Sequence, residues 1–209
     1  MLKKIKEFNG LKFNIRDKSF DDSVLKHEIL ADFYRVKNPG VVVDIGAHIG
    51  GTTILCASRG ADVYSYEPSK SNYKELLGNL ERNNLEAETF NVAVGNKGNR
   101  KLYHHKDNFG CFSFSRDNTN GMIDETEEVE TITIEEVFKD IDHCDLLKID
   151  CEGGEREFYK AIPVEKIDMI AMEIHDGSLE IKDYLSKFYN VDVVEASPES
   201  KDKLFICRK

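Results

Sequence analysis

Short apolar runs alternate with amphipathic segments along most of this chain. Runs typical of buried strands occur at residues 41–44, 62–66, 87–94, 145–150 and 169–174. The segments between them show helical periodicity or begin with helix-capping residues. This alternation predicts an α/β fold in which helices cover both faces of a mostly parallel sheet.

Helices are expected at residues 21–35, 49–59, 69–80, 155–161 and 178–188. In the third of these, Pro68 and Ser69 open the helix, and its apolar stripe comprises Tyr73, Leu76, Leu77 and Leu80. Ser178 caps the last helix, whose apolar face comprises Ile181, Tyr184, Leu185 and Phe188. A capping box, Thr133 to Glu136, predicts a further short helix that ends near Phe138.

Two more strands are expected at residues 191–195 and 204–208. The loop between them has about eight residues, which is too short for a helical crossover between parallel strands. We therefore expect the sheet to end in an antiparallel hairpin.

The chain contains no internal repeat, no low-complexity stretch and no flexible linker. We expect an N-terminal extension at residues 1–38, with one strand (residues 11–15) and one helix, that could cap the main domain at residues 39–209. Residues 95–131 are turn-rich and carry a group of aromatic and histidine residues. That group is compatible with either a substrate lid or ordinary core packing.

Composition narrows the classes of partner. The net charge is −10, so most of the surface would repel nucleic acid, and we expect no nucleic-acid partner. No apolar run is long enough to span a membrane, and the N-terminal lysines precede no signal-peptide core. The five cysteines are scattered, which indicates reduced thiols and a cytoplasmic protein. The oligomeric state stays open, with a homodimer as one option.

A glycine-containing loop follows the first buried run, with the pattern Asp44-x-Gly46-x-x-x-Gly50. The dinucleotide pattern G-x-G-x-x-G is absent, and an acid beside a pyrophosphate would be repulsive. Beside the amino group and sulfonium of S-adenosylmethionine, the same acid is favourable. Glu67 ends the next strand about twenty residues later, where a carboxylate can accept hydrogen bonds from ribose hydroxyls. The alternative interpretation of Glu67 is a solvated acid at the end of a strand, with no ligand.

At this point the sequence resembles a known family. The glycine loop and Glu67-Pro68 look like the first two cofactor motifs of class I S-adenosylmethionine-dependent methyltransferases. Residues 90–95 (FNVAVG), 147–155 (LKIDCEGGE) and 172–175 (MEIH) resemble the FkbM-type members of that class. The departures are His48, where the family often has Asn, and Gly154, where Ala or Val is common.

The resemblance implies a Rossmann-like, doubly wound, seven-stranded sheet that binds S-adenosylmethionine. It implies that the methionine end of the cofactor is wrapped by Asp44, Gly46, Ala47, His48 and Gly50. It further implies that the ribose is held by Glu67, next to Pro68, and that the adenine is bordered by Asn91 and Ala93.

Asp150 ends the strand expected beside the one that ends in Asp44, so it should face the transferable methyl group. Glu152 and Glu155 follow on the loop and early helix, and Glu173 and His175 end the next strand. The candidate catalytic residues are Asp150, Glu152, Glu173 and His175. His175 is the natural general base for a hydroxyl acceptor, and Asp150 or Glu152 could position the acceptor or act as base. The structural alternative for Glu152 and Glu155 is a pair of exposed acids in the first turn of a helix. The alternative for His175 is a strand-end histidine packed under the following loop. Asp150, Glu173 and His175 could together ligate Mg²⁺, but we expect no metal.

The function that the resemblance implies is O-methylation of a small molecule or of a sugar hydroxyl. Two alternatives stay open: N-methylation of an amine or a macromolecule, and a non-catalytic cofactor-binding module. The glycine spacing and Asp44 disfavour a nicotinamide-dependent dehydrogenase.

Overall fold

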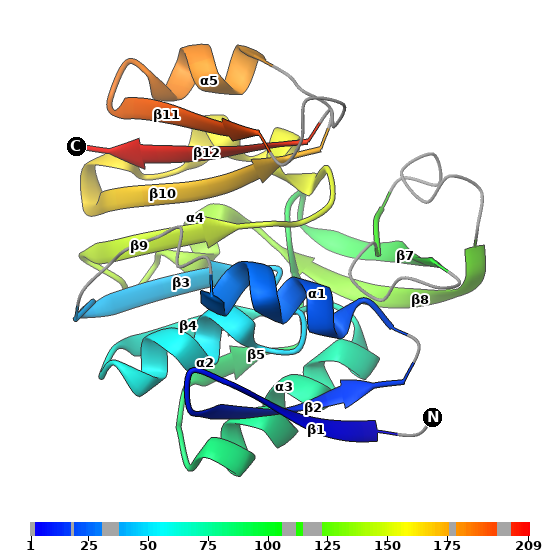
Figure 1. The fold of residues 1–209 in the computed structure, drawn as a ribbon. Coiled ribbons are helices and arrows are strands. Elements are labelled where there is room, and N and C mark those ends of the chain that lie inside the picture. The colour runs from blue at the N-terminus through cyan, green and yellow to red at the C-terminus, as the bar shows by residue number, and fades with distance from the viewer. Residues whose placement is uncertain are drawn as a thin grey trace.

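A seven-stranded sheet forms the centre of the molecule, in the order β11-β12-β10-β9-β3-β4-β5 (Figure 1). The computed structural model describes residues 3–17, 19–30, 38–105, 112–114, 123–175, 179–195 and 202–209. The strands of this sheet are β3 (Val41–Ile45), β4 (Asp62–Tyr66), β5 (Glu88–Phe90), β9 (Cys144–Ile149), β10 (Ile167–Ile174), β11 (Asn190–Glu195) and β12 (Lys203–Arg208). In this part of the chain, no helix is long and apolar enough to cross a membrane.

The pairing of the strands confirms the predicted class I methyltransferase architecture. Strands β10, β9, β3, β4 and β5 run parallel, whereas β12 lies antiparallel to both β10 and β11. The final hairpin is therefore part of the sheet, with its second strand inserted next to β10. Strand β9 lies beside β3, with Lys148 opposite Asp44, so the ends of these two strands meet at one edge.

Each face of the sheet packs against its own set of elements. On one face, Val43 and Leu147 join a core with α4 (Ile134–Val137), the short 3-10 helices η4 (Tyr159–Ala161) and η5 (Val164–Lys166), and α5 (Leu179–Leu185). A further 3-10 helix, η3 (Gly154–Glu157), precedes η4. On the other, Val42 and Leu146 pack with Cys56 of α2 (Gly51–Ser58). The alternation of side chains along β9 sends Leu146 and Lys148 to the α2 side.

The N-terminal segment is a hairpin followed by a helix. Strands β1 (Lys3–Phe8) and β2 (Leu11–Arg16) pair antiparallel across an Asn9-Gly10 turn, in which both residues have positive φ. Sequence analysis found β2 but missed β1, although Asn-Gly between apolar segments is a hairpin signature. The expected helix at 21–35 is α1 (Asp21–Leu25) followed by a π-helical turn, η1 (Lys26–Leu30). Residues 31–37 lie outside the described residues.

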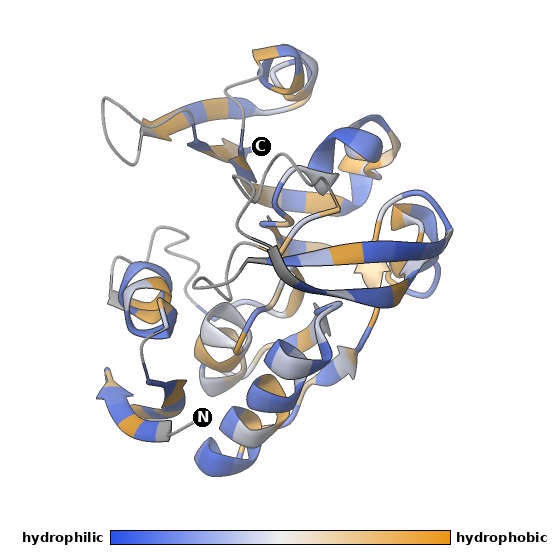
Figure 2. Ribbon diagram, turned by 90° about the vertical axis from the view of Figure 1, so that its right-hand side faces the viewer, coloured by the Kyte–Doolittle hydropathy of each residue, from blue (hydrophilic) through white to orange (hydrophobic). Residues whose placement is uncertain are grey.

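A second, three-stranded sheet corrects the prediction for residues 87–131. The expected strand at 87–94 splits into β5 and β6 (Ala93–Val94), which belong to different sheets. Strand β6 pairs with β8 (Ile123–Ile132), and β8 pairs with β7 (Gly98–His105). The long hairpin lies to the right of the main sheet in Figure 1 and faces the viewer in Figure 2, where much of it has the hydrophilic colour. Its strands are mostly polar because one face is solvated, so their apolar pattern is weak.

The predicted helices are partly confirmed. Helix α3 (Lys70–Asn83) is capped by Ser69, and the Thr133–Glu136 capping box is present. Leu76 and Leu80 are buried as expected, but Leu77 and Phe188 are exposed. The expected helix at 155–161 consists of two 3-10 turns, because two glycines precede it and the Glu155 side chain accepts the Gly153 N–H. Ser178 lies outside the described residues.

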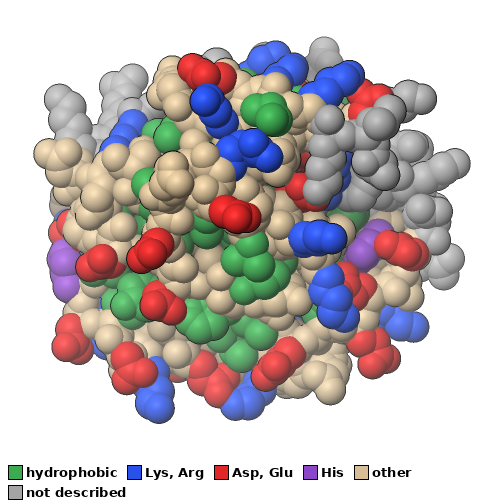
Figure 3. Space-filling model, turned by 90° about the horizontal axis from the view of Figure 1, so that it is seen from below, with side chains coloured by type: hydrophobic (Ala, Val, Ile, Leu, Met, Phe, Trp, Pro, Cys, Tyr) green, Lys and Arg blue, Asp and Glu red, His purple; other side chains and the backbone are tan. Residues whose placement is uncertain are grey.

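The surface carries mixed charge. Acidic and basic side chains are interspersed over the face shown in Figure 3, with hydrophobic side chains between them. Exposed apolar side chains in the described part of the chain include Ile5 on β1 and Leu77 on α3. Single exposed apolar side chains of this kind are ordinary for a folded protein and indicate no partner.

The backbones that follow β3 and β9 nearly touch at Gly46. This residue has φ +78°, and a Cβ atom on it would lie 1.7 Å from the carbonyl oxygen of Asp150. Only glycine permits such an approach, since the obstacle is backbone and cannot rotate away. The close approach holds the glycine loop against the end of β9.

We predict that Gly46→Ala destabilises the fold by more than about 3 kcal/mol, because backbone strain adds to a steric clash between main chains. Gly60→Ala is the matched control, since Gly60 has φ +87° but a Cβ atom on it would meet nothing within 4 Å. The control is expected to cost only about 1–2 kcal/mol. Equal losses for the two variants in urea unfolding would contradict the claim of a backbone contact.

Candidate functional site

One cavity of about 450 Å³ opens at the carboxyl ends of β3, β4, β9 and β10. This is where ligands bind in open α/β sheets, and the volume lies in the range of small-molecule sites. Eight of the residues selected from the sequence line it: Gly46, His48, Glu67, Pro68, Ala93, Asp150, Glu152 and Glu173. The other five do not line it: Asp44, Ala47, Gly50, Asn91 and His175.

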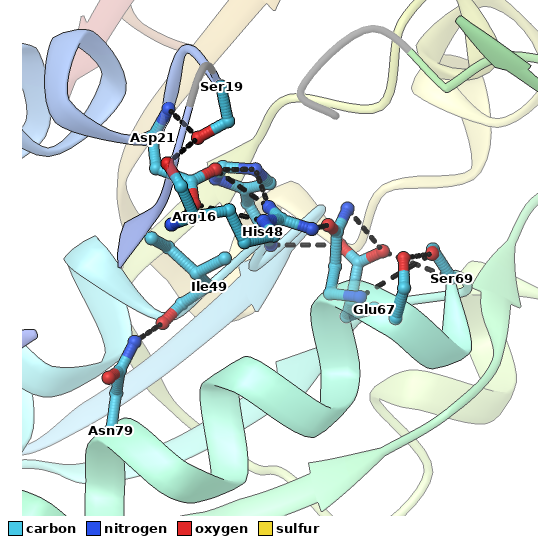
Figure 4. Close-up of polar contacts among 10 residues, drawn as sticks. Arg16, Ser19, Asp21, His48, Ile49, Glu67, Ser69 and Asn79 are labelled. Carbon is cyan, nitrogen blue, oxygen red and sulfur yellow. Dashed lines mark hydrogen bonds and ion pairs between the residues drawn. The ribbon is translucent and has the colours of Figure 1, made fainter. Parts of the chain in front are cut away.

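Glu67 is buried at the end of β4 and is no solvated acid. Its Oε2 accepts a hydrogen bond from the backbone N–H of His48 at 2.8 Å, and its Oε1 accepts one from Ser69 at 2.9 Å (Figure 4). The Asn72 side chain adds a longer contact of 3.4 Å. Burial raises the pKa of Glu67 to about 7. The carboxylate thus ties the glycine loop to the start of α3 while it lines the cavity.

Asn91 supports this corner from behind. Its side-chain amide donates to the carbonyl oxygens of Glu67 and Pro68, both at 2.9 Å. These two bonds fix the chain where it leaves β4 and set the direction of the Glu67 side chain. Ala93, two residues on, is buried and lines the cavity with a small apolar surface.

His48 links the glycine loop to the N-terminal segment. It adopts φ +51°, and its Nε2 lies 3.2 Å from Arg16 Nη2 and 3.6 Å from Asp21 Oδ1. Burial and the Arg16 guanidinium lower the pKa of His48 to about 4, so the ring is neutral and accepts from Arg16. Figure 4 shows Arg16 between Asp21 and His48. Sequence analysis missed both Arg16 and Asp21, because neither belongs to a recognisable motif.

Asp44 lies behind the loop, next to a buried lysine. It accepts a hydrogen bond from Thr53 Oγ1 at 2.7 Å, and Lys148 Nζ lies 3.3 Å from its other oxygen. The same Nζ donates to the carbonyl oxygen of Gly46 at 2.6 Å. Lys148 stands in the LKIDCEGGE segment, yet sequence analysis assigned it no role. The structure makes it the ammonium group that joins β9 to the glycine loop.

A histidine and three acids meet beyond the end of β9. His175 Nε2 lies 3.6 Å from Asp150 and 3.4 Å from Glu152, and its Nδ1 lies 3.8 Å from Glu155. Burial alone would lower the pKa of His175, but the three carboxylates outweigh it and raise the pKa to about 11. The ring is therefore an imidazolium at neutral pH, and in this state it cannot accept a proton.

Glu173 is a second acid that lines the cavity and has a pKa near neutrality, besides Glu67. The negative charge of Asp150 and partial burial raise the pKa of Glu173 to about 7. A carboxylate of this kind exchanges a proton near physiological pH. Glu173 lines the cavity together with Asp150, whereas His175 stands behind them.

The acid–histidine cluster also has the composition of a metal site. Asp150, Glu152 and His175 each offer a ligand atom within 4.8 Å of the others. This set replaces Glu173, which the sequence suggested, with Glu152. A divalent ion there would first have to displace the proton that His175 holds.

Aromatic side chains next to the second sheet form another wall, where Ser113 makes an isolated bridge to Tyr103 of β7. Phe112 and Phe114 both line the cavity, so part of the aromatic group in residues 95–131 lies at this site. Phe112 stacks on His104 with 4.2 Å between ring centroids, and the Arg100 guanidinium lies 4.0 Å from the Phe114 ring centroid. Residues 106–111, including Phe109, lie outside the described residues. The wall is therefore both packed core and cavity lining.

The sequence matches the model of the methyltransferase FkbM domain over residues 44–198. This chain belongs to the FkbM methyltransferase domain family. The family implies S-adenosylmethionine as methyl donor, in agreement with the resemblance found from the motifs. No curated protein sequence matches the chain.

Solved structures of methyltransferases share the fold of this family member. The tRNA (uracil-54, C5)-methyltransferase of Pyrococcus abyssi, in complex with S-adenosyl-L-homocysteine, aligns with a TM-score of 0.60 and 14% identity. The T. thermophilus 16S rRNA N2 G1207 methyltransferase, in complex with AdoMet and guanosine, aligns with a TM-score of 0.55 and 12% identity. The alignments cover 99% and 100% of this chain but only 44% and 50% of those proteins. At such identities the likeness shows the fold alone.

We predict that Lys148→Met destabilises the protein by about 3–5 kcal/mol at pH 8, because Asp44 then lies buried without its cation. The loss should shrink at pH 5.5. Glu28 is a second acid beside Lys148, and burial raises its pKa to about 8. The stability linked to the proton on Glu28 is therefore present at low pH and is lost as the pH rises through 8.

Lys166→Met is the control for this prediction. Lys166 Nζ donates only to the carbonyl oxygens of Phe138 and Ile141 in the hydrogen bonds of the described chain. Its loss in urea unfolding should be smaller and the same at both pH values. An equal loss at both pH values for Lys148→Met would show that the ammonium does not balance the carboxylates.

Proposed function

We propose that this FkbM-family domain transfers a methyl group from S-adenosylmethionine to a hydroxyl oxygen of a small molecule or a sugar. The observation that carries the proposal is that one cavity is lined both by Glu67 and by Asp150 and Glu173. Glu67 suits the ribose of the donor, and the other two acids suit an acceptor that must lose a proton.

The residues present fit the donor. A cavity of about 450 Å³ accommodates a ligand of this size, and Ala93 with its neighbours offers an apolar border for adenine. Both Glu67 oxygens already accept protein hydrogen bonds, but a carboxylate has about four acceptor positions and can take ribose hydroxyls as well. When bound, the donor supplies a methyl group on a positively charged sulfur, which Asp150 would face.

The acceptor end of the cavity favours a hydroxyl substrate. A hydroxyl must lose its proton as the new bond forms, and a base with a pKa near the working pH does this best. Glu173 meets this requirement, whereas His175 is held as an imidazolium by its three acidic neighbours. We assign His175 a positioning role, since it holds Asp150 and Glu152 in place.

The walls near these acids suggest a compact acceptor with an apolar face. Phe112, Phe114 and Phe20 line the cavity, which favours a sugar ring or an aromatic alcohol that packs against an aromatic side chain. An amine that is already neutral needs no base before it attacks the methyl group, so such an acceptor would make no use of Glu173. A module without catalysis would make no use of it either.

We predict that Glu173→Gln lowers methyl transfer by about 10²–10⁴-fold, because the acceptor proton loses its base. Transfer from labelled S-adenosylmethionine to a panel of sugars, phenols and amines provides the measurement. In the wild type the rate should rise with pH through about 7, as Glu173 ionises, and the variant should lose this dependence.

Asp168→Asn is the matched control on the same strand. Asp168 is exposed near the start of β10, does not line the cavity, and its substitution should leave transfer unchanged. Transfer to amines with no transfer to any hydroxyl would overturn the assignment of the acceptor. Absence of transfer to every acceptor, with the donor bound, would favour the non-catalytic module.

A further inference from the structure

A buried acid from the N-terminal segment lines the cavity and belongs to no cofactor motif. Glu28 lies on η1 and is only 6% exposed. Its Oε1 accepts a hydrogen bond from Thr52 Oγ1 at 3.2 Å. Its Oε2 has no hydrogen-bond partner among the described residues. An acceptor left buried in this way is costly, which indicates a missing donor.

The glycine loop is built to admit this carboxylate. A Cβ atom on Gly51, the first residue of α2, would lie 2.0 Å from Glu28 Oε2. The second glycine of the Gly50-Gly51 pair therefore leaves room for an acid that comes from a different part of the chain. This close fit and the hydrogen bond from Thr52 together fix the position of the Glu28 carboxylate in the cavity wall.

The charges around Glu28 do not balance. Lys148 Nζ lies 3.8 Å from Glu28, 3.3 Å from Asp44 and 3.9 Å from Asp150, so three carboxyl groups share one ammonium. Burial, with the charges of Asp44 and Asp150, raises the pKa of Glu28 to about 8 even though Lys148 opposes it. A second cation with hydrogen-bond donors would complete this wall.

We propose that Glu28 is a cofactor-binding residue whose carboxylate accepts a hydrogen bond from the α-ammonium group of the methyl donor. The inference rests on the proposed function, since it requires the donor to bind in this cavity. An α-ammonium carries three donors and a positive charge, which are the features that the wall lacks. The N-terminal segment thereby contributes a ligand contact to the site as well as covering it.

The test compares two ligands that differ at the amino-acid end. S-adenosylhomocysteine has the α-ammonium, whereas 5′-methylthioadenosine keeps the adenosine and the sulfur but lacks the amino-acid group. Calorimetric titration of the full chain should show that Glu28→Gln lowers the affinity for S-adenosylhomocysteine by about tenfold or more. The affinity of the same variant for 5′-methylthioadenosine should stay within about twofold of the wild-type affinity.

Glu67→Gln is the matched control, because Glu67 faces the part that both ligands share. Glu67→Gln should lower the affinity for both ligands by a similar factor. If Glu28→Gln does not fold, Glu28→Asp replaces it, since this variant keeps the charge but withdraws it by one methylene group. It should show the same selective loss, smaller in size.

Four results would overturn the inference. If Glu28→Gln weakens both ligands equally, the role of Glu28 is structural. If it changes neither, Glu28 makes no contact with the ligand. If it tightens S-adenosylhomocysteine, the carboxylate faces the carboxylate of the ligand instead of the ammonium. If wild type binds neither ligand, the proposed function fails together with the inference, and this outcome is distinct from the other three.

Discussion

The ammonium group of Lys148 is the point on which the architecture of the site depends. It is almost fully buried, donates to the carbonyl oxygen of Gly46, and lies within 4.0 Å of three carboxylates from three separate segments. Removing an ion from water is costly, so such a group persists only where its partners are fixed. Through Lys148, the glycine loop, the end of β9 and the N-terminal segment are held in one arrangement, and the cavity lies between them.

A second polar network closes the other side of the glycine loop. Arg16 and Asp21 form a buried ion pair at 2.7 Å, and Arg16 also contacts His48 and Asn72. Asn72 in turn contacts Glu67. The N-terminal segment is therefore bonded to the glycine loop and to the start of α3. These contacts attach the described part of residues 1–38, which the sequence suggests are an extension, to the cavity. Donor binding and packing of this segment should consequently be coupled.

Much of the central sheet could be predicted from the sequence, because buried parallel strands such as β3 and β9 are continuous apolar runs. The β7–β8 hairpin could not, since β8 is rich in Glu and the two strands bury only one face. The glycine loop and Glu67 were found from local spacing. Lys148 and Glu28 were missed because their roles arise from contacts between distant segments, which spacing does not record. The base role suggested for His175 depended on its charged neighbours, and these are visible only in three dimensions.

The central claim is that a single cavity holds the donor at Glu67 and the acceptor at Asp150 and Glu173. A crystal structure of the chain with S-adenosylhomocysteine tests it most directly. The account predicts ribose hydroxyls within hydrogen-bond distance of Glu67 and a sulfur atom that faces the Asp150 side of the cavity. A ligand bound elsewhere, or one whose sulfur points away from Asp150 and Glu173, would contradict it.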